Sequence, residues 1–333
     1  MNLKIQTRAG QLPEEWDVLA GDNPYLKRNF LSFIEQTERE YRPRYYLFYE
    51  GTRADSCFVA YRNRKFDIGM FTPKRIYRPV TMIYLPMSVT RAGIVLGSLR
   101  EEVLQTIRKM RGYTLVLNAP EENAPEFSTG LTCPKCILRV EWDSFDGYVS
   151  ALRSDYRNRL KKTFARTQEV TIRFIDNKTQ FTRQLYELYL NVLNRSQTRI
   201  ETLSPDYFRG EKFCIFVAEK GGRPVGFVQL LENGKELIFE FVGMDYSANA
   251  DGALYHRMLY EIIRYGTEHG FESIDFGQTA DESKLKLGCA YTYLYAWLHH
   301  SSPLVNFFCK RAAPVLAWHS SGKTYRVFKG DRE

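Results

Sequence analysis

The chain is poor in cysteine and histidine and has no long apolar run. Its 333 residues include 6 cysteines and 5 histidines. No stretch reaches the roughly 18 apolar residues of a membrane-spanning helix, and the first residues lack the apolar core of a secretory signal. The cysteines are scattered, at positions 57, 133, 136, 214, 289 and 309. They form no disulfide framework, so we expect a reducing, cytoplasmic setting.

Metal-binding patterns are also missing. Cys133 and Cys136 form a lone CxxC, whereas structural zinc normally needs a second pair of Cys or His at comparable spacing. A redox pair would stand at a strand-to-helix junction, but this one follows a loop rich in Pro and Glu. We therefore expect incidental cysteines, no metal and no permanently bound cofactor.

The composition is that of a folded, basic protein. Apolar residues make up 44% of the chain and aromatic residues 14%, which argues against disorder, and the length suits two domains. The formal net charge of +8 suggests an anionic partner, although a protein that simply has a basic surface is equally consistent with it. A phosphorylated co-substrate, a nucleic acid and an anionic membrane all satisfy this condition.

The chain repeats one plan of strands and helices. Residues Arg44–Tyr61 and Phe213–Leu230 each read as strand, polar turn and strand. Each half continues with an amphipathic helix that leads into a strand, over residues 99–118 and 254–277. Two such units at similar offsets predict a duplicated α/β unit.

Composition also predicts a boundary and a tail. Residues 121–132 have the composition of a loop, and Ser144 is suited to N-cap a helix that begins at Phe145. We therefore expect an N-terminal domain over residues 1–141 and a C-terminal domain over residues 142–302. Residues 303–333 read as an amphipathic, basic tail, which either packs back on the domain or lies at an anionic membrane.

The most informative stretch runs from residue 236 to residue 288. A strand rich in aromatic and β-branched residues, Glu236–Gly243, leads into a loop of small residues, Tyr246–Gly252, and then into an amphipathic helix. Backbone N–H groups and the helix dipole at such a helix start favour anions. A second strand, Ser273–Gly277, and the short signature Lys284-Leu-Lys-Leu-Gly288 follow.

These motifs resemble one branch of the GNAT acyltransferase superfamily, the FemAB-like and BioF2-like enzymes. The matching residues are Asp275-Phe-Gly277 and Lys284 with Gly288, supported by the segment Asn23–Glu35 and the basic segment Leu152–Lys162. The resemblance implies two tandem GNAT-like domains with mixed, mostly antiparallel central sheets flanked by helices. It also implies a degenerate N-terminal copy on the acceptor side and a C-terminal copy that binds the donor and carries the catalytic residues.

The resemblance implies that the loop after the first strand holds the acyl donor. The expected donor-binding residues are Tyr246, Ser247, Ala248, Asn249 and Gly252. The loop departs from ordinary acetyl-CoA enzymes because it lacks their Arg/Gln-x-x-Gly-x-Gly/Ala pattern. The donor could therefore be acyl-CoA or an acyl-carrier protein as co-substrate, or an aminoacyl-tRNA.

Four residues are the expected catalytic groups. Lys284 is expected at the mouth of a cleft, where it would pair with a phosphate, a carboxylate or an oxyanion, and its removal should cost little stability. Asp275 could line that cleft or pair with a cation at a strand edge. Glu240 stands mid-strand among aromatics, where burial would suit it to be a base, unless it faces solvent. His256 is a further base or phosphate ligand, or a structural histidine.

Arg157, Lys161 and Gln278 are the expected substrate-binding residues. Arg157 and Lys161 are four residues apart on a basic helix, which suits a diphosphate or an RNA backbone, although a solvated basic face is equally consistent.

The sequence thus predicts an N-acyltransferase that moves an acyl group to the amine of a cell-envelope or lipid precursor. Its setting would be the cytoplasm, with possible peripheral contact at the inner face of the membrane. A Fem-type peptidyltransferase that uses aminoacyl-tRNA, and a non-catalytic module that binds RNA or membrane, are the alternatives.

Overall fold

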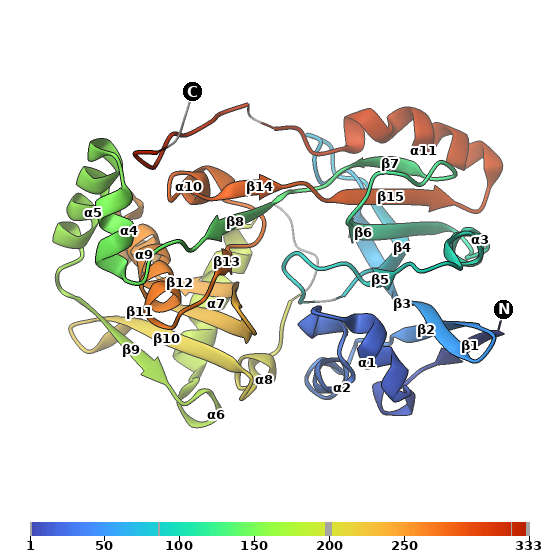
Figure 1. Cartoon of the computed structure of the whole chain (residues 1–333), viewed down its shortest axis with the longest axis horizontal. Coiled ribbons are helices and arrows are strands. Elements are labelled where there is room, and N and C mark those ends of the chain that lie inside the picture. The colour runs from blue at the N-terminus through green and yellow to red at the C-terminus, as the bar shows by residue number, and fades with distance from the viewer. Residues whose placement is uncertain (1, 86, 197–201, 321, 331–333) are drawn as a thin grey trace. The chain divides into compact units, whose positions relative to one another are not determined.

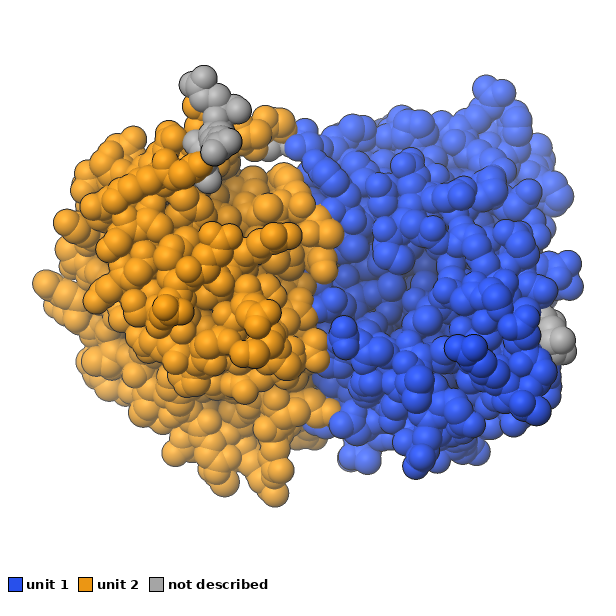
Figure 2. Space-filling model, viewed as in Figure 1, with its two compact units in different colours: residues 1–134, 293–321 blue, residues 135–292, 322–333 orange. Residues whose placement is uncertain are grey.

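The chain forms two compact α/β units in a computed structural model (Figure 1). The structure describes residues 2–85, 87–196, 202–320 and 322–330. Unit 1 comprises residues Met1–Pro134 and Tyr293–Ser321, and unit 2 comprises residues Lys135–Thr292 and Gly322–Glu333 (Figure 2). Each unit is built around one sheet with helices packed on it.

In unit 1 the sheet holds eight strands. They are β1 (Asn2–Gln6), β2 (Arg44–Glu50), β3 (Arg53–Asp67), β4 (Tyr77–Ile83), β5 (Ile94–Val95), β6 (Tyr113–Ala119), β7 (Ser128–Leu131) and β15 (Tyr295–His300). The helices are η1 (Ala9–Gln11), α1 (Glu14–Ala20), η2 (Pro24–Leu26), α2 (Arg28–Thr37), α3 (Arg100–Arg108) and α11 (Pro303–Leu316).

In unit 2 the sheet holds seven strands. They are β8 (Lys135–Arg139), β9 (Val170–Ile175), β10 (Phe213–Lys220), β11 (Arg223–Asn233), β12 (Glu236–Met244), β13 (Ser273–Asp275) and β14 (Ala290–Thr292). The helices are α4 (Phe145–Ala151), α5 (Ser154–Arg166), α6 (Asn177–Gln180), α7 (Arg183–Arg195), α8 (Pro205–Phe208), η3 (Tyr246–Ala248), η4 (Ala250–Gly252), α9 (Ala253–Glu268) and α10 (Asp281–Leu285).

The two sheets have one topology, which confirms the predicted duplication and the mixed, mostly antiparallel sheets. The order is β1-β2-β3-β4-β6-β15-β7 in unit 1 and β9-β10-β11-β12-β13-β8-β14 in unit 2. Among the described strands, each order has one parallel pair, and it stands at the same place: β4 with β6 and β12 with β13. The two predicted hairpins, β2–β3 and β10–β11, occupy the second and third positions of their sheets.

The boundaries differ from the expected ones because the two halves exchange a strand. The sixth strand of unit 1 is β15, which follows the strands of unit 2 in the chain, and the sixth strand of unit 2 is β8, which precedes residue 142. The segments 135–141 and 293–302 therefore each belong to the unit opposite to the one predicted. The arrangement depends on strands that pair although they lie more than a hundred residues apart in the sequence, β15 with β6 and β13 with β8. Local composition does not indicate such pairing.

Local sequence explains the elements that form the site of unit 2. Gly221 and Gly222 both take positive φ, 59° and 73°, in the two-residue turn between β10 and β11, as the hairpin requires. Helix α9 buries the apolar stripe that periodicity predicted, including Leu254, Met258 and Ile262. Gly266 lies on the inner face of α9, where an added Cβ would stand 2.6 Å from Ile274, so this glycine lets α9 approach β13.

The tail divides between the two units. Helix α11 packs on β7 and β15 of unit 1, with Cys309 buried. Residues 322–330 belong to unit 2, where Phe328 lies against Trp142 with ring centroids 4.9 Å apart. None of the helices in the described part of the chain is long and apolar enough to cross a membrane.

Candidate functional site

The central strands of unit 2 separate after three paired residues. Strands β12 and β13 pair in parallel only from Glu236 with Ser273 to Ile238 with Asp275. Strand β12 continues to Met244, whereas β13 ends at Asp275. The edge of β12 that faces β13 is therefore not paired with β13 beyond Ile238.

A β-bulge lies in β12 at this split. Gln229 pairs with Phe241 and Leu230 pairs with Phe239, which leaves Glu240 as the extra residue without a partner on β11. Bulges re-aim a side chain and are frequent beside active sites. Ile238 and Asp275 are paired, so their side chains lie on the same face of the sheet.

Glu240 is buried and lies beside two polar groups that the sequence did not single out. Its side chain is 6% exposed, and the Tyr207 hydroxyl donates to its Oε2 at 3.2 Å. Burial lowers the pKa of Lys212 to about 8, against the opposing charge of Glu240. Of the two options for Glu240, burial and exposure to solvent, the structure shows burial.

Gln229 is a further polar group on the same strand pair. It is fully buried, and neither atom of its amide has a hydrogen-bond partner among the described residues. Strand β11 is otherwise apolar at this point, since Val228 and Leu230 flank Gln229. That isolated amide in an apolar strand is the signal that could have identified it.

Asp275 and Lys284 both lie in the interior, whereas Lys284 was expected at the mouth of a cleft, where its removal would cost little stability. Asp275 is fully buried and its Oδ1 accepts from the Gly277 N–H at 2.8 Å. Lys284 is 2% exposed, and its Nζ donates to the carbonyl oxygen of Gln278 at 2.6 Å. Burial lowers the pKa of Lys284, while the charges of nearby groups, Asp275 among them, act in the opposite direction.

The turn between β13 and α10 has an unusual backbone. Gly277, Thr279 and Ala280 take positive φ values of 73°, 61° and 47°. For Thr279 and Ala280 this conformation is strained, and such strain concentrates at ligand sites and switch segments. Lys284 holds the backbone of this turn in place through its hydrogen bond to Gln278. Gln278 contributes through its carbonyl oxygen there.

The loop expected to hold the donor is fixed by its own side chains. Asp245 Oδ1 accepts from the N–H of Ser247 at 2.9 Å, and Asn249 Oδ1 accepts from the N–H of Tyr255 at 3.1 Å. Asp251 and Gly252 then take positive φ, 53° and 73°, immediately before α9. The loop is thus a set of tight turns that end at the N-terminus of a 16-residue helix. Tyr246 and Ala248 form the first of these turns.

A cavity of about 410 Å³ opens between α5 and the start of α9. Three cations from α5 line it: Arg159, Lys162 and Arg166. They are spaced by three and then four residues, which is the spacing of one helix face. Asp155 and Asp251 are its acidic residues, and Asp251 pairs with Arg166 at 3.6 Å. Cations and a helix N-terminus on one cavity suit a phosphate-bearing ligand.

His256 also lines this cavity. Its Nδ1 lies 2.9 Å from the carbonyl oxygen of Gly252, so Nδ1 carries the proton and Nε2 holds a lone pair. Burial lowers the pKa of His256, and the charges of Arg159 and Lys286 lower it further, against the hydrogen bond to Gly252. His256 is therefore neutral at pH 7.

The two residues predicted on the basic helix point elsewhere. Arg157 donates from Nη2 to the carbonyl oxygen of Leu152 at 2.8 Å, and Lys161 is exposed. Neither lines the cavity between α5 and α9. The sequence showed that the segment is basic. Which of its cations face the cavity depends on the side of α5 that packs on α9, and the sequence does not show that side.

The matching position in unit 1 is filled by the protein itself. The carboxylate of Asp55 accepts from the N–H groups of Ser98 and Leu99, at 3.0 and 2.9 Å, at the start of α3. These hydrogen bonds, with those of Ser56 and the Ser98 hydroxyl, lower the pKa of Asp55 to about 2, against its desolvation. A carboxylate thus occupies the helix N-terminus that an anionic ligand would need.

Residues 150–285 match the family model described as the acetyltransferase (GNAT) domain. No protein of curated function matches the chain significantly by sequence. The matched segment contains α5, the bulged strand β12, α9, β13 and Lys284, and ends before Gly288.

Solved structures match over nearly the whole chain. FemX is 11% identical, covers 93% of this chain and 100% of its own, and has a TM-score of 0.55. L-PGS from Bacillus licheniformis is 11% identical, with coverages of 93% and 98% and a TM-score of 0.53. A tandem GNAT protein from the clavulanic acid biosynthesis pathway is 10% identical, with coverages of 91% and 99% and a TM-score of 0.55. At these identities the likeness is one of fold.

Proposed function

This chain is an acyltransferase with a GNAT domain in a FemAB-like tandem fold, as the sequence predicted, and we propose that it transfers an acyl group from a thioester to an amine. The donor is acyl-CoA or an acyl-carrier protein, both of which carry phosphate next to the thioester arm. The observation that carries this choice is the cavity between α5 and α9, with Arg159, Lys162 and Arg166 on its wall.

The donor would enter with its phosphates at the start of α9. The three cations and the helix N-terminus neutralise them. His256 is neutral and lines the same cavity, so it would act there as a hydrogen-bond partner rather than as a charge. The loop Tyr246–Gly252 supplies the turn that brings the backbone close. From there the arm of the donor can follow the edge of β12 that is not paired with β13.

The thioester carbonyl would then reach the bulge at Glu240. The amine nitrogen attacks the carbonyl carbon, a C–N bond forms, and the C–S bond breaks as the thiolate leaves. The attacking amine must lose a proton, and Glu240, buried beside Tyr207 and Lys212, is the base in this scheme. Asp275 and Lys284 hold the turn after β13 and so position the opposite wall of the split.

The acceptor is proposed to be the amine of a cell-envelope or lipid precursor, in the cytoplasm or at the inner face of the membrane. Gln229 offers a buried donor and acceptor near the bulge for a polar group of that acceptor. Aminoacyl-tRNA is the competing donor, because a basic α5 can also contact an RNA backbone. A module that only binds RNA or membrane would have no use for a buried carboxylate beside the split.

Mass spectrometry of the purified protein with acyl-CoA pools and charged tRNA tests the proposal. We expect loss of acyl-CoA with release of free CoA in the presence of an amine pool. Glu240→Gln should abolish the loss, whereas the matched control Glu236→Gln, on the same strand before the split, should keep it. If charged tRNA is consumed and acyl-CoA is not, aminoacyl-tRNA replaces acyl-CoA as the proposed donor. Consumption of neither, by a folded protein, would refute it.

A further inference from the structure

The outer face of α11 is apolar. Leu304, Phe308 and Val315 are 67%, 60% and 66% exposed, and Phe307 is 50% exposed. These residues lie on the side of α11 that faces away from β7 and β15, since Cys309 is the buried one. Four large apolar side chains in solvent on one helix mark an interaction surface rather than a scatter of single residues.

A basic hairpin end adjoins the same region of unit 1. Between positions 62 and 78, where β3 turns into β4, the chain carries six cations and a single acid, Asp67. The cations are all exposed: Arg62, Arg64, Lys65, Lys74, Arg75 and Arg78. Tyr77 is 48% exposed, with the Lys65 ammonium 5.2 Å from its ring centroid. Aromatic rings with adjacent cations are typical of surfaces that meet lipid headgroups.

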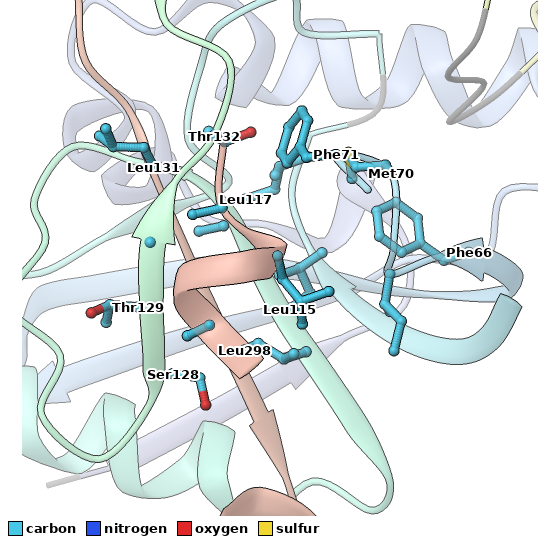
Figure 3. Close-up of a pocket in the computed structure, with 16 residues that line it drawn as sticks. Phe66, Met70, Phe71, Leu115, Leu117, Ser128, Thr129, Leu131, Thr132 and Leu298 are labelled. Atoms are coloured by element: carbon cyan, nitrogen blue, oxygen red, sulfur yellow. The ribbon is translucent and has the colours of Figure 1, made fainter. Parts of the chain in front are cut away.

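An apolar pocket lies between these two elements (Figure 3). Phe66, Met70 and Phe71 of the hairpin end face Leu115 and Leu298 of the sheet, and Leu316 of α11 completes the lining. Its volume is about 60 Å³, a few times the roughly 15 Å³ that one buried water molecule needs. That space suits the end of an alkyl chain and is too small for a ring system with substituents.

We propose that unit 1 binds the surface of an anionic membrane through α11 and the β3–β4 hairpin end, and that the pocket between them takes the end of one phospholipid acyl chain. Both elements beside the pocket are basic: the hairpin end carries the six cations named above, and α11 carries Lys310 and Arg311. A second copy of this face would meet like charges, whereas anionic headgroups neutralise both elements. The exposed aromatics supply the apolar contact that a purely electrostatic surface would lack.

The proposal concerns unit 1 alone and is independent of the donor chemistry of unit 2. It gives the proposed lipid-borne acceptor a place to be held, but vesicle binding can be measured without any transfer. Failure of vesicle binding would leave the transferase proposal intact. Failure to consume any donor would likewise leave the membrane surface intact.

Co-sedimentation of the full chain with vesicles tests the surface. We expect binding to vesicles of equal phosphatidylglycerol and phosphatidylcholine, little binding to phosphatidylcholine alone, and a loss of at least tenfold between about 0.05 M and about 0.5 M salt. Phe307→Ser with Phe308→Ser, and separately Arg64→Glu with Lys74→Glu, should each weaken binding at least tenfold.

Matched controls lie elsewhere on unit 1. Val18→Ser, at a residue 79% exposed on α1, and Arg8→Glu with Arg39→Glu should leave binding unchanged. Equal binding to neutral vesicles, or equal losses in the controls, would overturn the proposal. A dimer in solution that Phe307→Ser with Phe308→Ser dissociates would assign the face to a second copy and would also overturn it.

The pocket has its own test. Trp318 follows Ala317, a lining residue, so phosphatidylglycerol brominated near its chain ends should quench Trp318 fluorescence, and Trp318→Phe identifies that signal. Ala313→Phe should fill the pocket and abolish the quenching while vesicle binding persists. Quenching that survives in Ala313→Phe, or its absence in the bound wild-type protein, would refute the acyl-chain site.

Discussion

Lys284 illustrates at the residue scale how burial decides a role. Its ammonium is enclosed, donates to the carbonyl oxygen of Gln278 and lies near Asp275. A buried charge without its partners is costly, and so are partners left without the charge. Lys284 therefore stabilises the turn after β13 in addition to its proposed role in transfer, and removing it affects both stability and activity.

We predict that Lys284→Met lowers the free energy of unfolding by about 2–4 kcal/mol and abolishes transfer. The methionine keeps most of the volume but removes the ammonium that donates to the Gln278 carbonyl oxygen and lies near Asp275. Lys286→Met is the control, because its ion pair with Glu282 lies at the surface and should cost at most about 1 kcal/mol. Urea unfolding measures both, and equal costs would contradict the buried role.

Lys212 makes stability depend on pH in a defined window. Its pKa is about 8 in the folded protein, lowered by burial from an ordinary value of 10.5. Between these two pH values the unfolded chain binds more protons than the folded one, so the free energy of unfolding rises with pH. Below pH 8 the cost of the buried ammonium is present in full.

We predict that the free energy of unfolding of Lys212→Met, taken relative to the wild type, stays constant below pH 8 and falls as pH rises from 8 towards 10. The difference between the two proteins isolates one group from all others that titrate. Urea unfolding at several pH values supplies it. A difference that stays constant over this range would mean that Lys212 titrates with an ordinary pKa.

At the scale of elements, the segment 322–330 holds α10 and α4 together. Phe328 lies against Trp142 and Tyr148, with centroid distances of 4.9 and 6.0 Å. A Cβ added at Gly288, where φ is 98°, would stand 2.3 Å from the Phe328 ring. The glycine of the Lys-x-x-x-Gly signature is thus explained by a backbone conformation and a close approach.

We predict that Gly288→Ala costs about 2–4 kcal/mol, because it adds a strained φ to an overlap with a packed ring. Gly270→Ala is the matched control, since φ is 69° there and an added Cβ has nothing within 4 Å. It should cost about 1 kcal/mol, from the backbone alone. Indistinguishable unfolding midpoints for the two variants would contradict the role of Phe328.

Sequence predicted the elements better than their partners. Periodicity identified α9 and both hairpins, because their signals are local. The bulge at Glu240, the burial of Lys284 and the choice of Arg159 over Arg157 depend on strand register and on how α5 rotates against α9. None of these has a local signature. Gln229 was visible in the sequence as a lone amide in an apolar strand.

At the scale of the whole molecule, the exchange of strands makes each unit depend on the other half of the chain. Strand β15 lies between β6 and β7 in the sheet of unit 1, although it follows unit 2 in the sequence. Trp297 of β15 is fully buried in the core of unit 1. A cut between the halves at residue 141 therefore removes an interior strand, the one between β6 and β7, from the first sheet.

We predict that a fragment of residues 1–141 lacks cooperative unfolding, because β6 and β7 lose the strand that joins them and the core loses Trp297. Adding a peptide of residues 293–321 should restore a cooperative transition, followed by circular dichroism in urea. A fragment 1–141 that unfolds cooperatively by itself would show that the exchanged strand is dispensable.

The central claim is that α5 and the start of α9 hold the phosphates of the donor, and calorimetric titration with CoA tests it most directly. We predict binding by the wild type and a loss of about 10- to 100-fold in Arg159→Ala, as for a lost charge-assisted hydrogen bond. Lys161→Ala, on the same helix but outside the cavity, should bind within about twofold of the wild type, as expected for a distant surface charge. Absence of CoA binding, or equal losses in the two variants, would contradict the account.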